Sequence, residues 1–354
     1  MKTQLLKLLS CPECRCPLAI EVRECDGEEI QTGTLRCPTC KREFPIRGGI
    51  PRFAPAAAYA SSFSFEWKQW RRTQFDTSTR RVSERSFNAS TGWALEALKG
   101  RLVVDAGCGA GRFTDLAARA GAEVVGIDLS QAIEVAQENL RHRPNCHFVQ
   151  ADILKSPFRP GVFDLAFSIG VLHHTPNTRE GFRRLVETVR PGGEVAIWVY
   201  PMYRLAETFE YFPDRVEEVL ALDVNYRIPV RGEAMVRRYA KALDWIMETS
   251  SAVERAFTTR LPPRVLYWFC HAAIPLYYLY RIPLFYPLRL ITKIAMHPEP
   301  EWRVLDTFDW YSPKYQWKHT YPEVRRWFAE AGLEEIKILP RPVAMRGKKP
   351  AKTV

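Results

Sequence analysis

Four cysteines near the start of the chain have the spacing of a metal site. They form two C-x-x-C pairs, Cys11 with Cys14 and Cys37 with Cys40, and 22 residues separate the pairs. Four thiolates in two such turns surround Zn²⁺ tetrahedrally and leave no open position, so we expect a structural site. Because so short a segment buries little apolar surface, the metal would supply its free energy of folding. We therefore predict a zinc-ribbon module at residues 1–53.

A glycine-rich turn follows a hydrophobic run and leads into a predicted helix at residues 103–113. Glycine lets the backbone turn sharply and lets a ligand approach, because it carries no Cβ. The start of the helix offers unpaired N–H groups and the positive end of its dipole to a carboxylate or another anion. The acid just before the turn suits an amino-acid ammonium group. The residues predicted at this ligand are Asp105, Gly107, Cys108, Gly109 and Gly111.

Acidic residues also end the next two predicted strands, at Asp128 and Asp152. Asp128 is placed to accept hydrogen bonds from both hydroxyls of a ribose. Asp152 suits an exocyclic adenine amine, and Ile153 suits the face of the ring. Dinucleotide dehydrogenases share the turn and the first acid, but their G-x-G-x-x-G pattern needs glycine where this chain has Arg112 or Thr114. The pattern therefore disfavours a dehydrogenase.

With these motifs in order, residues 101–200 resemble the class I S-adenosylmethionine-dependent methyltransferases. The segments that carry the resemblance are residues 105–111, 126–130, 150–153, 163–177 and 189–193. The resemblance implies S-adenosylmethionine as cofactor. Together, the resemblance and the positions of the strand ends predict the following residues at the cofactor: Asp105, Gly107, Cys108, Gly109, Gly111, Asp128, Leu129, Asp152, Ile153 and Ser168. The end of the ribbon segment, residues 44–51, resembles small zinc-ribbon proteins that accompany methyltransferases.

Methyl transfer needs little chemistry from the protein beyond alignment in a dry site, because a sulfonium methyl is already activated. An oxygen acceptor would benefit from a general base. His173 and His174 follow the fourth predicted strand, and we predict His174 as the catalytic base. The alternative is that both histidines only pack the loop. Further candidates in the late segment are Asp309, Tyr311, His319 and Tyr321.

The positions of these residues depend on an alternation of strands and helices between residues 93 and 200, typical of a parallel sheet. We predict strands at residues 102–104, 122–127, 146–150, 163–169 and 194–200, and helices at 113–119, 131–142 and 179–189. A helix at 321–331 and a strand at 333–339 complete the sheet. The fold predicted is an α/β, Rossmann-like methyltransferase sheet with helices on both faces, a zinc ribbon and a helical, aromatic-rich insertion. The predicted divisions are residues 1–53, 54–92, 93–200, 201–318 and 319–354.

The insertion carries a charge-free stretch at Val265–Tyr280, which is shorter than the roughly 20 apolar residues that span a bilayer. Three interpretations remain open: a cap without membrane contact, a lid over an apolar or lipid-linked acceptor, and peripheral contact with an anionic membrane. Residues 63–75 and 301–321, rich in aromatic side chains, either wall the acceptor pocket or pack as connectors.

Composition limits the function classes. A hydrophobic content of 46% argues against disorder, and the paired cysteines with no signal-peptide core argue for a cytoplasmic protein, with membrane association left open. The net charge of +11 suits an anionic partner. The leading hypothesis is methyl transfer to a small-molecule, lipid-linked or glycan-type acceptor. The alternatives are a zinc-containing RNA methyltransferase and a non-catalytic partner that retains the fold.

Overall fold

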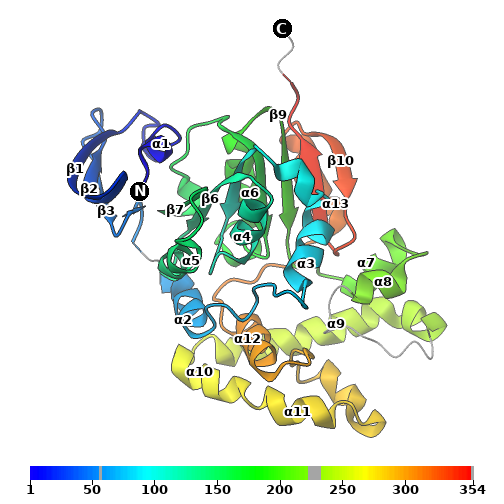
Figure 1. Ribbon diagram of the computed structural model, residues 1–354. Helices are drawn as coiled ribbons and strands as arrows, with labels where there is room; N and C mark the ends of the chain where they lie inside the picture. The colour runs from blue at the N-terminus through cyan, green and yellow to red at the C-terminus, as the bar shows by residue number, and fades with distance from the viewer. Residues whose placement is uncertain (56–57, 222–232, 352–354) are drawn as a thin grey trace.

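The centre of the molecule is a seven-stranded sheet with the order β10-β11-β9-β8-β5-β6-β7 (Figure 1). This computed structural model describes residues 1–55, 58–221 and 233–351. The strands from β5 to β9 run parallel, and β11 pairs antiparallel with both β9 and β10. The strands are β5 (Leu102–Ala106), β6 (Glu123–Asp128), β7 (Cys146–Gln150), β8 (Phe163–Ile169), β9 (Val189–Trp198), β10 (Glu334–Ile338) and β11 (Ala344–Lys348).

Helices cover both faces of this sheet, because alternate residues of each buried strand point to opposite sides. Val103 and Val124 face one hydrophobic core, whereas the adjacent Val104 and Val125 face another. The helices that contribute to the first core are α3 (Val82–Thr91), α4 (Arg112–Arg119) and α5 (Ala132–Leu140), and those of the second are α6 (Thr178–Thr188) and α13 (Tyr321–Glu330). The predicted Rossmann-like fold with two helical layers is confirmed.

The N-terminal module is a small antiparallel sheet, β1-β2-β3-β4, that lies beside the β7 edge (Figure 1). Its elements are α1 (Thr3–Leu6), β1 (Ala19–Asp26), β2 (Glu29–Arg36), β3 (Glu43–Arg47) and β4 (Ile50–Pro51). After β4 the chain runs along β7, where Arg52 forms a parallel bridge with Gln150. Leu5, Leu9 and Leu35 are buried in the same core as one face of the large sheet. The module is therefore packed onto the sheet.

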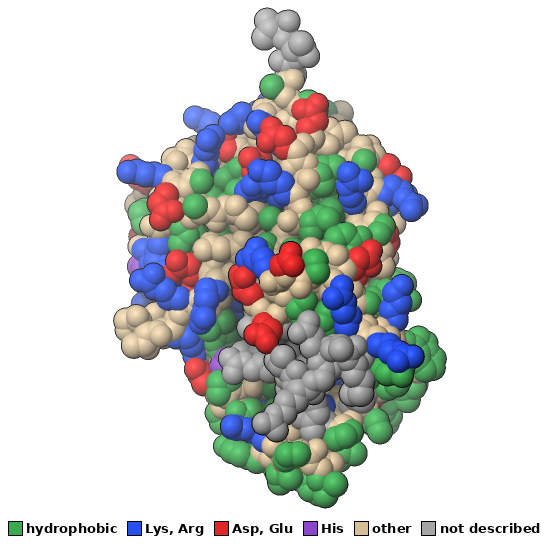
Figure 2. Space-filling model, turned by 90° about the vertical axis from the view of Figure 1, so that its right-hand side faces the viewer, with side chains coloured by type: hydrophobic (Ala, Val, Ile, Leu, Met, Phe, Trp, Pro, Cys, Tyr) green, Lys and Arg blue, Asp and Glu red, His purple; other side chains and the backbone are tan. Residues whose placement is uncertain are grey.

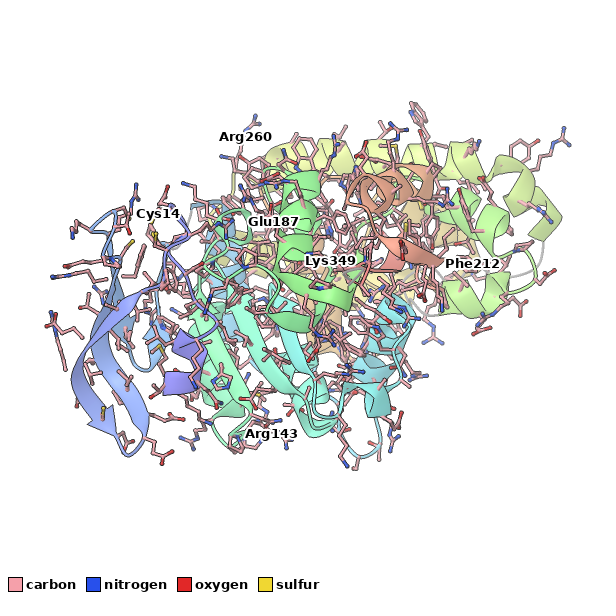
Figure 3. The ribbon with its side chains drawn as sticks, turned by 90° about the horizontal axis from the view of Figure 1, so that it is seen from above. Cys14, Arg143, Glu187, Phe212, Arg260 and Lys349 are labelled. Atoms are coloured by element: carbon pink, nitrogen blue, oxygen red, sulfur yellow. The ribbon has the colours of Figure 1, made fainter. Side chains whose placement is uncertain are left out.

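The module also holds the loop that follows β7. The N–H of Ser10 donates to the carbonyl of Pro157 at 2.7 Å, and Leu9 forms an antiparallel bridge with Phe158. Arg15 donates to the Phe158 carbonyl at 3.4 Å and pairs with Glu187 of α6 at 3.5 Å. Figure 3 labels Glu187 and Cys14, which lie on either side of this junction. Because this loop begins with the predicted adenine-binding residues, the module can influence their position.

A helical cap, described at residues 204–221 and 233–311, is inserted between β9 and α13 and lies across the carboxyl ends of the parallel strands (Figure 1). Its elements are α7 (Arg204–Tyr211), α8 (Val216–Ala221), α9 (Glu233–Thr258), α10 (Pro263–Cys270), α11 (Ala273–Leu279), η6 (Pro283–Leu290) and α12 (Pro300–Tyr311). The predicted charge-free stretch is thus divided between α10 and α11. None of the helices in the described part of the chain is long and apolar enough to cross a membrane.

The cap meets the sheet through α2 (Ser61–Gln69), which lies between α5 and α12. Trp70 at the end of α2 shares a small core with Leu266 of α10 and Phe308 of α12. The aromatic segment before the sheet therefore joins the late insertion to the strand ends. Four short 3-10 helices also occur: η1 (Ala58–Ala60), η2 (Leu95–Leu98), η3 (Ile153–Lys155) and η4 (Leu172–His174).

Candidate active site

A cavity of about 330 Å³ lies between the carboxyl ends of the parallel strands and the helical cap. One wall consists of the turns that follow β5, β6, β7 and β8. The opposite wall comes from α2, α9, α12 and residues 316–318. Open α/β sheets bind ligands in this position, because the strand ends present loops and helix N-termini there. Since one space touches both walls, a cofactor at the strand ends and an acceptor under the cap would meet.

Residues other than glycine would strain the backbone of the turn after β5. Gly107 has φ +88°, and a Cβ there would lie 2.3 Å from a methyl carbon of Val171. Gly109 has φ +53°, and its Cβ would lie 3.0 Å from the indole of Trp67. The N–H of Gly107 donates to the carbonyl of Ile127 at 2.7 Å, which ties the turn to β6. The requirement for glycine therefore comes from both the backbone angle and the lack of space.

Asp128 ends β6 with its carboxylate oriented by three donors. It accepts hydrogen bonds from the Gly109 N–H at 2.9 Å, the Ser130 N–H at 2.8 Å and the Ser130 hydroxyl at 2.7 Å. Burial raises the pKa of Asp128, and these donors act in the opposite direction. The carboxylate lies in the cavity wall beside Leu129. Its geometry suits an acceptor for ribose hydroxyls.

The third strand end brings Asp152 and Ile153 into the same wall. Asp152 accepts the N–H of Leu154 at 2.9 Å, which holds its carboxylate at the start of η3. Tyr59 also lines the cavity, and its burial, together with the nearby charges of Asp152 and Asp128, raises its pKa. The structure thus gathers seven of the predicted cofactor residues around one space: Gly107, Cys108, Gly109, Asp128, Leu129, Asp152 and Ile153.

Three predicted cofactor residues lie outside that wall and support the turn. Asp105 is buried and accepts the hydroxyl of Thr114 at 2.7 Å, and burial raises its pKa to about 7. The hydroxyl of Ser168 donates to the Ala106 carbonyl at 2.8 Å. Gly111 begins α4 at φ +90°. Sequence spacing predicts these residues near the ligand, but it cannot show that the Asp105 carboxylate turns toward Thr114 of the following helix α4.

His174 is the histidine of the predicted pair whose ring lines the cavity. Its Nδ1 lies 2.8 Å from the Tyr315 carbonyl, which can only accept, so Nδ1 carries the hydrogen in the neutral ring. Within the described residues its Nε2 is buried without a hydrogen-bond partner. Burial lowers the pKa of His174 to about 3, so the imidazole is neutral at physiological pH. His174 therefore presents a lone pair on Nε2.

His173 differs from its neighbour in both position and contacts. Its ring is fully buried and packs on Tyr200 with a centroid distance of 3.9 Å, outside the cavity wall. Burial lowers the pKa of His173 well below its usual range. The hypothesis that the histidines are loop-packing residues thus fits His173, whereas His174 lines the cavity.

The half of the cavity under the cap contains carboxyl groups whose pKa is raised by burial. Tyr200 donates its hydroxyl to Asp309 at 2.8 Å, and burial raises the pKa of Asp309 to about 6. Glu66 of α2 is 1% exposed, and its Oε2 has no hydrogen-bond partner in the part of the chain that is described. Burial and the charges of Asp309 and Asp306 raise the pKa of Glu66 well above its ordinary value. A protonated Glu66 can donate a hydrogen bond into the cavity.

Sequence reasoning did not single out Glu66, although an acid within the aromatic run at residues 63–75 was a usable signal. It also missed Glu248, which pairs with Lys293 at 3.6 Å and Lys318 at 3.3 Å in the wall. Burial lowers the pKa of Lys318 to about 8. These residues come from three distant segments, so no local pattern could connect them.

The late candidates divide into two groups. Asp309 and Tyr311 line the cavity. His319 instead contacts the Thr178 hydroxyl at 3.0 Å, and the Tyr321 hydroxyl donates to the Leu339 carbonyl at 3.1 Å. Both lie outside the wall: His319 links the segment after the cap to α6, and Tyr321 links α13 to the residue that follows β10. The aromatic side chains that line the cavity include Phe63, Trp67, Trp70, Phe75, Tyr200, Trp302, Trp310 and Tyr311.

The four cysteines of the N-terminal module converge, with their sulfur atoms all within 4.8 Å of one another. Cys11 and Cys40 are 3.5 Å apart, and Cys14 and Cys37 are 3.3 Å apart. The two turns match, since the residue after each pair has φ +62° and donates back to the carbonyl of the first cysteine. Zinc–thiolate bonds of about 2.3 Å place tetrahedral sulfurs roughly 3.8 Å apart. The donor set therefore fits a closed zinc site.

This sheet, with its glycine turn and strand-end acids around one cavity, defines an S-adenosylmethionine-dependent methyltransferase fold. Comparison with known families agrees. Residues 104–197 match the family described as methyltransferase domain, and residues 2–49 match the family described as Trm112p-like protein. The chain thus joins a methyltransferase domain to a Trm112p-like domain.

Individual known proteins are similar to parts of the chain. An ubiquinone biosynthesis O-methyltransferase of Albidiferax ferrireducens is 36% identical over 105 residues, covering 28% of this chain and 40% of that protein. A probable tRNA methyltransferase 9B of Homo sapiens is 33% identical over 119 residues, covering 32% and 25%. A solved O-methyltransferase family protein from Burkholderia thailandensis has a TM-score of 0.40 at 13% identity, covering 77% and 56%. The chain spans less than half the length of the first two proteins.

Proposed function

We propose that this protein transfers the methyl group of S-adenosylmethionine to an oxygen atom of a small polar acceptor, of a lipid-linked or glycan type. The observation that carries the proposal is the continuity of one cavity from the strand ends to the cap, with His174 in its wall. The matched methyltransferase domain supports the reaction class. The O-methyltransferase from Albidiferax ferrireducens is consistent with oxygen as the attacked atom.

The strand ends would hold the cofactor. Asp128 would accept the ribose hydroxyls and Asp152 the adenine amine, while Ile153 and Leu129 would pack against the adenosyl group. When bound, S-adenosylmethionine supplies an electrophilic methyl group on a positively charged sulfur. Trp67 lies against Gly109 and helps to exclude water from the turn.

His174 would act as the general base. As the acceptor oxygen forms its bond to the methyl carbon, the carbon–sulfur bond breaks, and the hydroxyl proton passes to Nε2 of His174. The Tyr315 carbonyl keeps the hydrogen on Nδ1 and directs Nε2 for this step. A buried imidazolium is normally costly, but the charge gained by His174 replaces the one lost at sulfur. The net charge of the site is therefore unchanged during the transfer. This offsets the cost of burying a charged imidazolium, which is the cost that lowers the pKa of His174 before the transfer.

The acceptor half of the cavity suits a hydroxyl-rich molecule. Aromatic faces such as those of Trp70 and Trp302 can pack on the C–H groups of a sugar-like ring. The protonated carboxyl of Glu66 can donate to an acceptor oxygen, and Lys318 adds a buried positive charge. This mixture of aromatic and paired polar groups supports a polar acceptor.

We further propose that the four cysteines bind one structural zinc ion. The closed sulfur cluster and the match to a Trm112p-like domain support this. The ion would stabilise the module and, through the contacts of Ser10 and Arg15, the loop that begins with Asp152.

Transfer of labelled methyl groups to fractionated cell extract tests the function. We expect label in the lipid or small-molecule fractions and little in RNA. His174→Gln should lower the turnover of the labelled acceptor by roughly 10²-fold or more, the scale of a lost general base, with cofactor affinity unchanged. The matched control is His142→Gln, at an exposed histidine between α5 and β7 that does not line the cavity. Full activity of His174→Gln would contradict the assignment.

The second candidate function is methylation of RNA. Two observations favour it: the similarity to a probable tRNA methyltransferase 9B and the net charge of +11. This function predicts label in the RNA fraction and RNA binding that weakens steeply as salt increases.

A further inference from the structure

The outer surface of the cap is unusually apolar. Residues 265–291 carry eight of the seventeen large hydrophobic side chains that are exposed in the described chain. Leu284 is 79% exposed and Trp268 is 71% exposed. Figure 2 shows hydrophobic side chains gathered at the lower end of the molecule, the end that the cap forms in Figure 1. Contiguous exposed apolar surface of this kind marks an interaction site.

Helix α10 explains how this surface arises, because it is apolar on two sides. Leu266 and Cys270 point inward and pack in a buried core with Trp302 and Phe308. The exposed residues Val265, Trp268 and Phe269 have i, i+3 and i+4 spacing. They therefore lie together on one face of the helix. The outward face is therefore continuous and is not needed to hold α10 on the protein.

Positive charges accompany this face. Between Arg255 and Pro298 the sequence contains six Lys or Arg residues and no Asp or Glu. Arg260, Arg264 and Arg281 have no ion pair with any carboxylate in the described ranges. Figure 3 shows Arg260 projecting away from the body of the protein. Basic side chains beside exposed Trp, Phe and Leu complement a surface that is negatively charged outside and apolar beneath.

We propose that the apolar face, formed by the outer sides of α10, α11 and η6, docks on an anionic phospholipid membrane. Trp268, Phe269 and Leu284 would enter the boundary between headgroups and acyl chains, and the arginines would contact the phosphate groups. The inference goes beyond the proposed function, and the docking holds or fails independently of methyl transfer.

The packing of the cap gives the docking a consequence for the cavity. Helices α10 and α11 both pack on α12, and Trp302 and Asp306 of α12 line the acceptor half. Packed helices lie roughly 8–10 Å apart, so one helix layer separates the apolar face from the acceptor half. A lipid-linked acceptor would therefore have its polar group near the cavity while its chain remained in the membrane. This last step rests on the proposed function.

Flotation of the full chain with lipid vesicles tests the docking. We expect binding to vesicles of phosphatidylcholine with phosphatidylglycerol, weaker binding to phosphatidylcholine alone, and a loss of binding as salt increases. The double variant Trp268→Ser and Leu284→Ser should lower the partition by roughly tenfold or more. Arg264→Gln with Arg281→Gln should abolish the preference for anionic vesicles. The control is Val22→Ser, at a valine on β1 that is 46% exposed and lies outside the cap.

Two outcomes would overturn the docking: wild-type protein that does not float with anionic vesicles, or a serine double variant that floats as well as wild type. Self-association that the serine variant abolishes, without any flotation, would show that the face binds a second copy and would also overturn it. Calorimetry with S-adenosylhomocysteine on the same samples separates the two proposals. Normal cofactor binding without flotation refutes docking alone, whereas flotation without cofactor binding refutes the proposed function alone.

Discussion

The substitution Asp128→Asn tests the cofactor site with the least disturbance of the fold. Asparagine has the same shape and keeps one oxygen acceptor, but it loses the negative charge and gains an NH₂ group. In the structure one carboxylate oxygen accepts the Gly109 N–H and the other accepts both Ser130 donors. A ribose would add its two hydroxyls to these oxygens, so the substitution replaces a charge-assisted acceptor with a donor on one side.

A hydrogen bond to a charged group contributes about 1.5–3 kcal/mol. The loss of one such bond to ribose should therefore raise the dissociation constant of S-adenosylhomocysteine by roughly 10- to 150-fold. Isothermal titration calorimetry measures this directly. Ser130→Ala serves as the control, because it removes the 2.7 Å hydroxyl contact to Asp128 but no acceptor for ribose. We expect a change of less than about fivefold for this variant. An Asp128→Asn protein that binds as tightly as wild type would refute the reasoning.

Three other perturbations test the supporting parts of the site. Removal of zinc by a chelator should release about one ion per chain and lower the melting temperature. It should also weaken cofactor binding through the loop after β7. A metal-free protein with normal melting temperature and cofactor affinity would disprove the link between the zinc site and the cofactor site. Gly107→Ala should lower the free energy of unfolding, measured with urea, by about 1–3 kcal/mol from backbone strain alone. The close contact with Val171 should add to this loss. An unchanged free energy of unfolding would show that the turn is not constrained. Asp105→Asn should change the pH dependence of stability. The folded pKa of about 7 lies above the ordinary 3.8, so folded wild-type protein holds a proton that the unfolded chain releases between these values. Wild-type protein should therefore lose up to about 4 kcal/mol of unfolding free energy relative to Asp105→Asn as the pH rises from about 4 to 7, and a constant difference would contradict the assigned burial cost.

The central sheet could be predicted from the sequence because its signals are local. The strand predicted at residues 163–169 has the same bounds as β8, and the predicted strand at 146–150 coincides with β7. Acids at consecutive strand ends must meet at one edge of a parallel sheet, so the proximity of Asp128 and Asp152 also followed from the pattern.

Contacts that depend on side-chain direction or on long-range packing could not be predicted from the sequence. Asp105 precedes the turn as expected, but its carboxylate accepts a hydrogen bond from Thr114, which lies in the first turn of α4. Glu66 faces the cavity because α2 packs against the distant α12, and only the tertiary structure brings these elements together. For the same reason the docking of the N-terminal module on the β7 edge had no signal in the spacing of its cysteines.

The proposed function requires the cofactor to bind at the carboxyl ends of β5, β6 and β7. Hydrogen–deuterium exchange of the full chain, with and without S-adenosylhomocysteine, measures this without knowledge of the acceptor. We predict slower exchange in the turns that follow β5, β6 and β7, at residues 107–111, 128–131 and 152–155, with the outer face of the cap unchanged. Bound ligand with protection confined to other segments, or no protection at saturating ligand, would contradict the central claim.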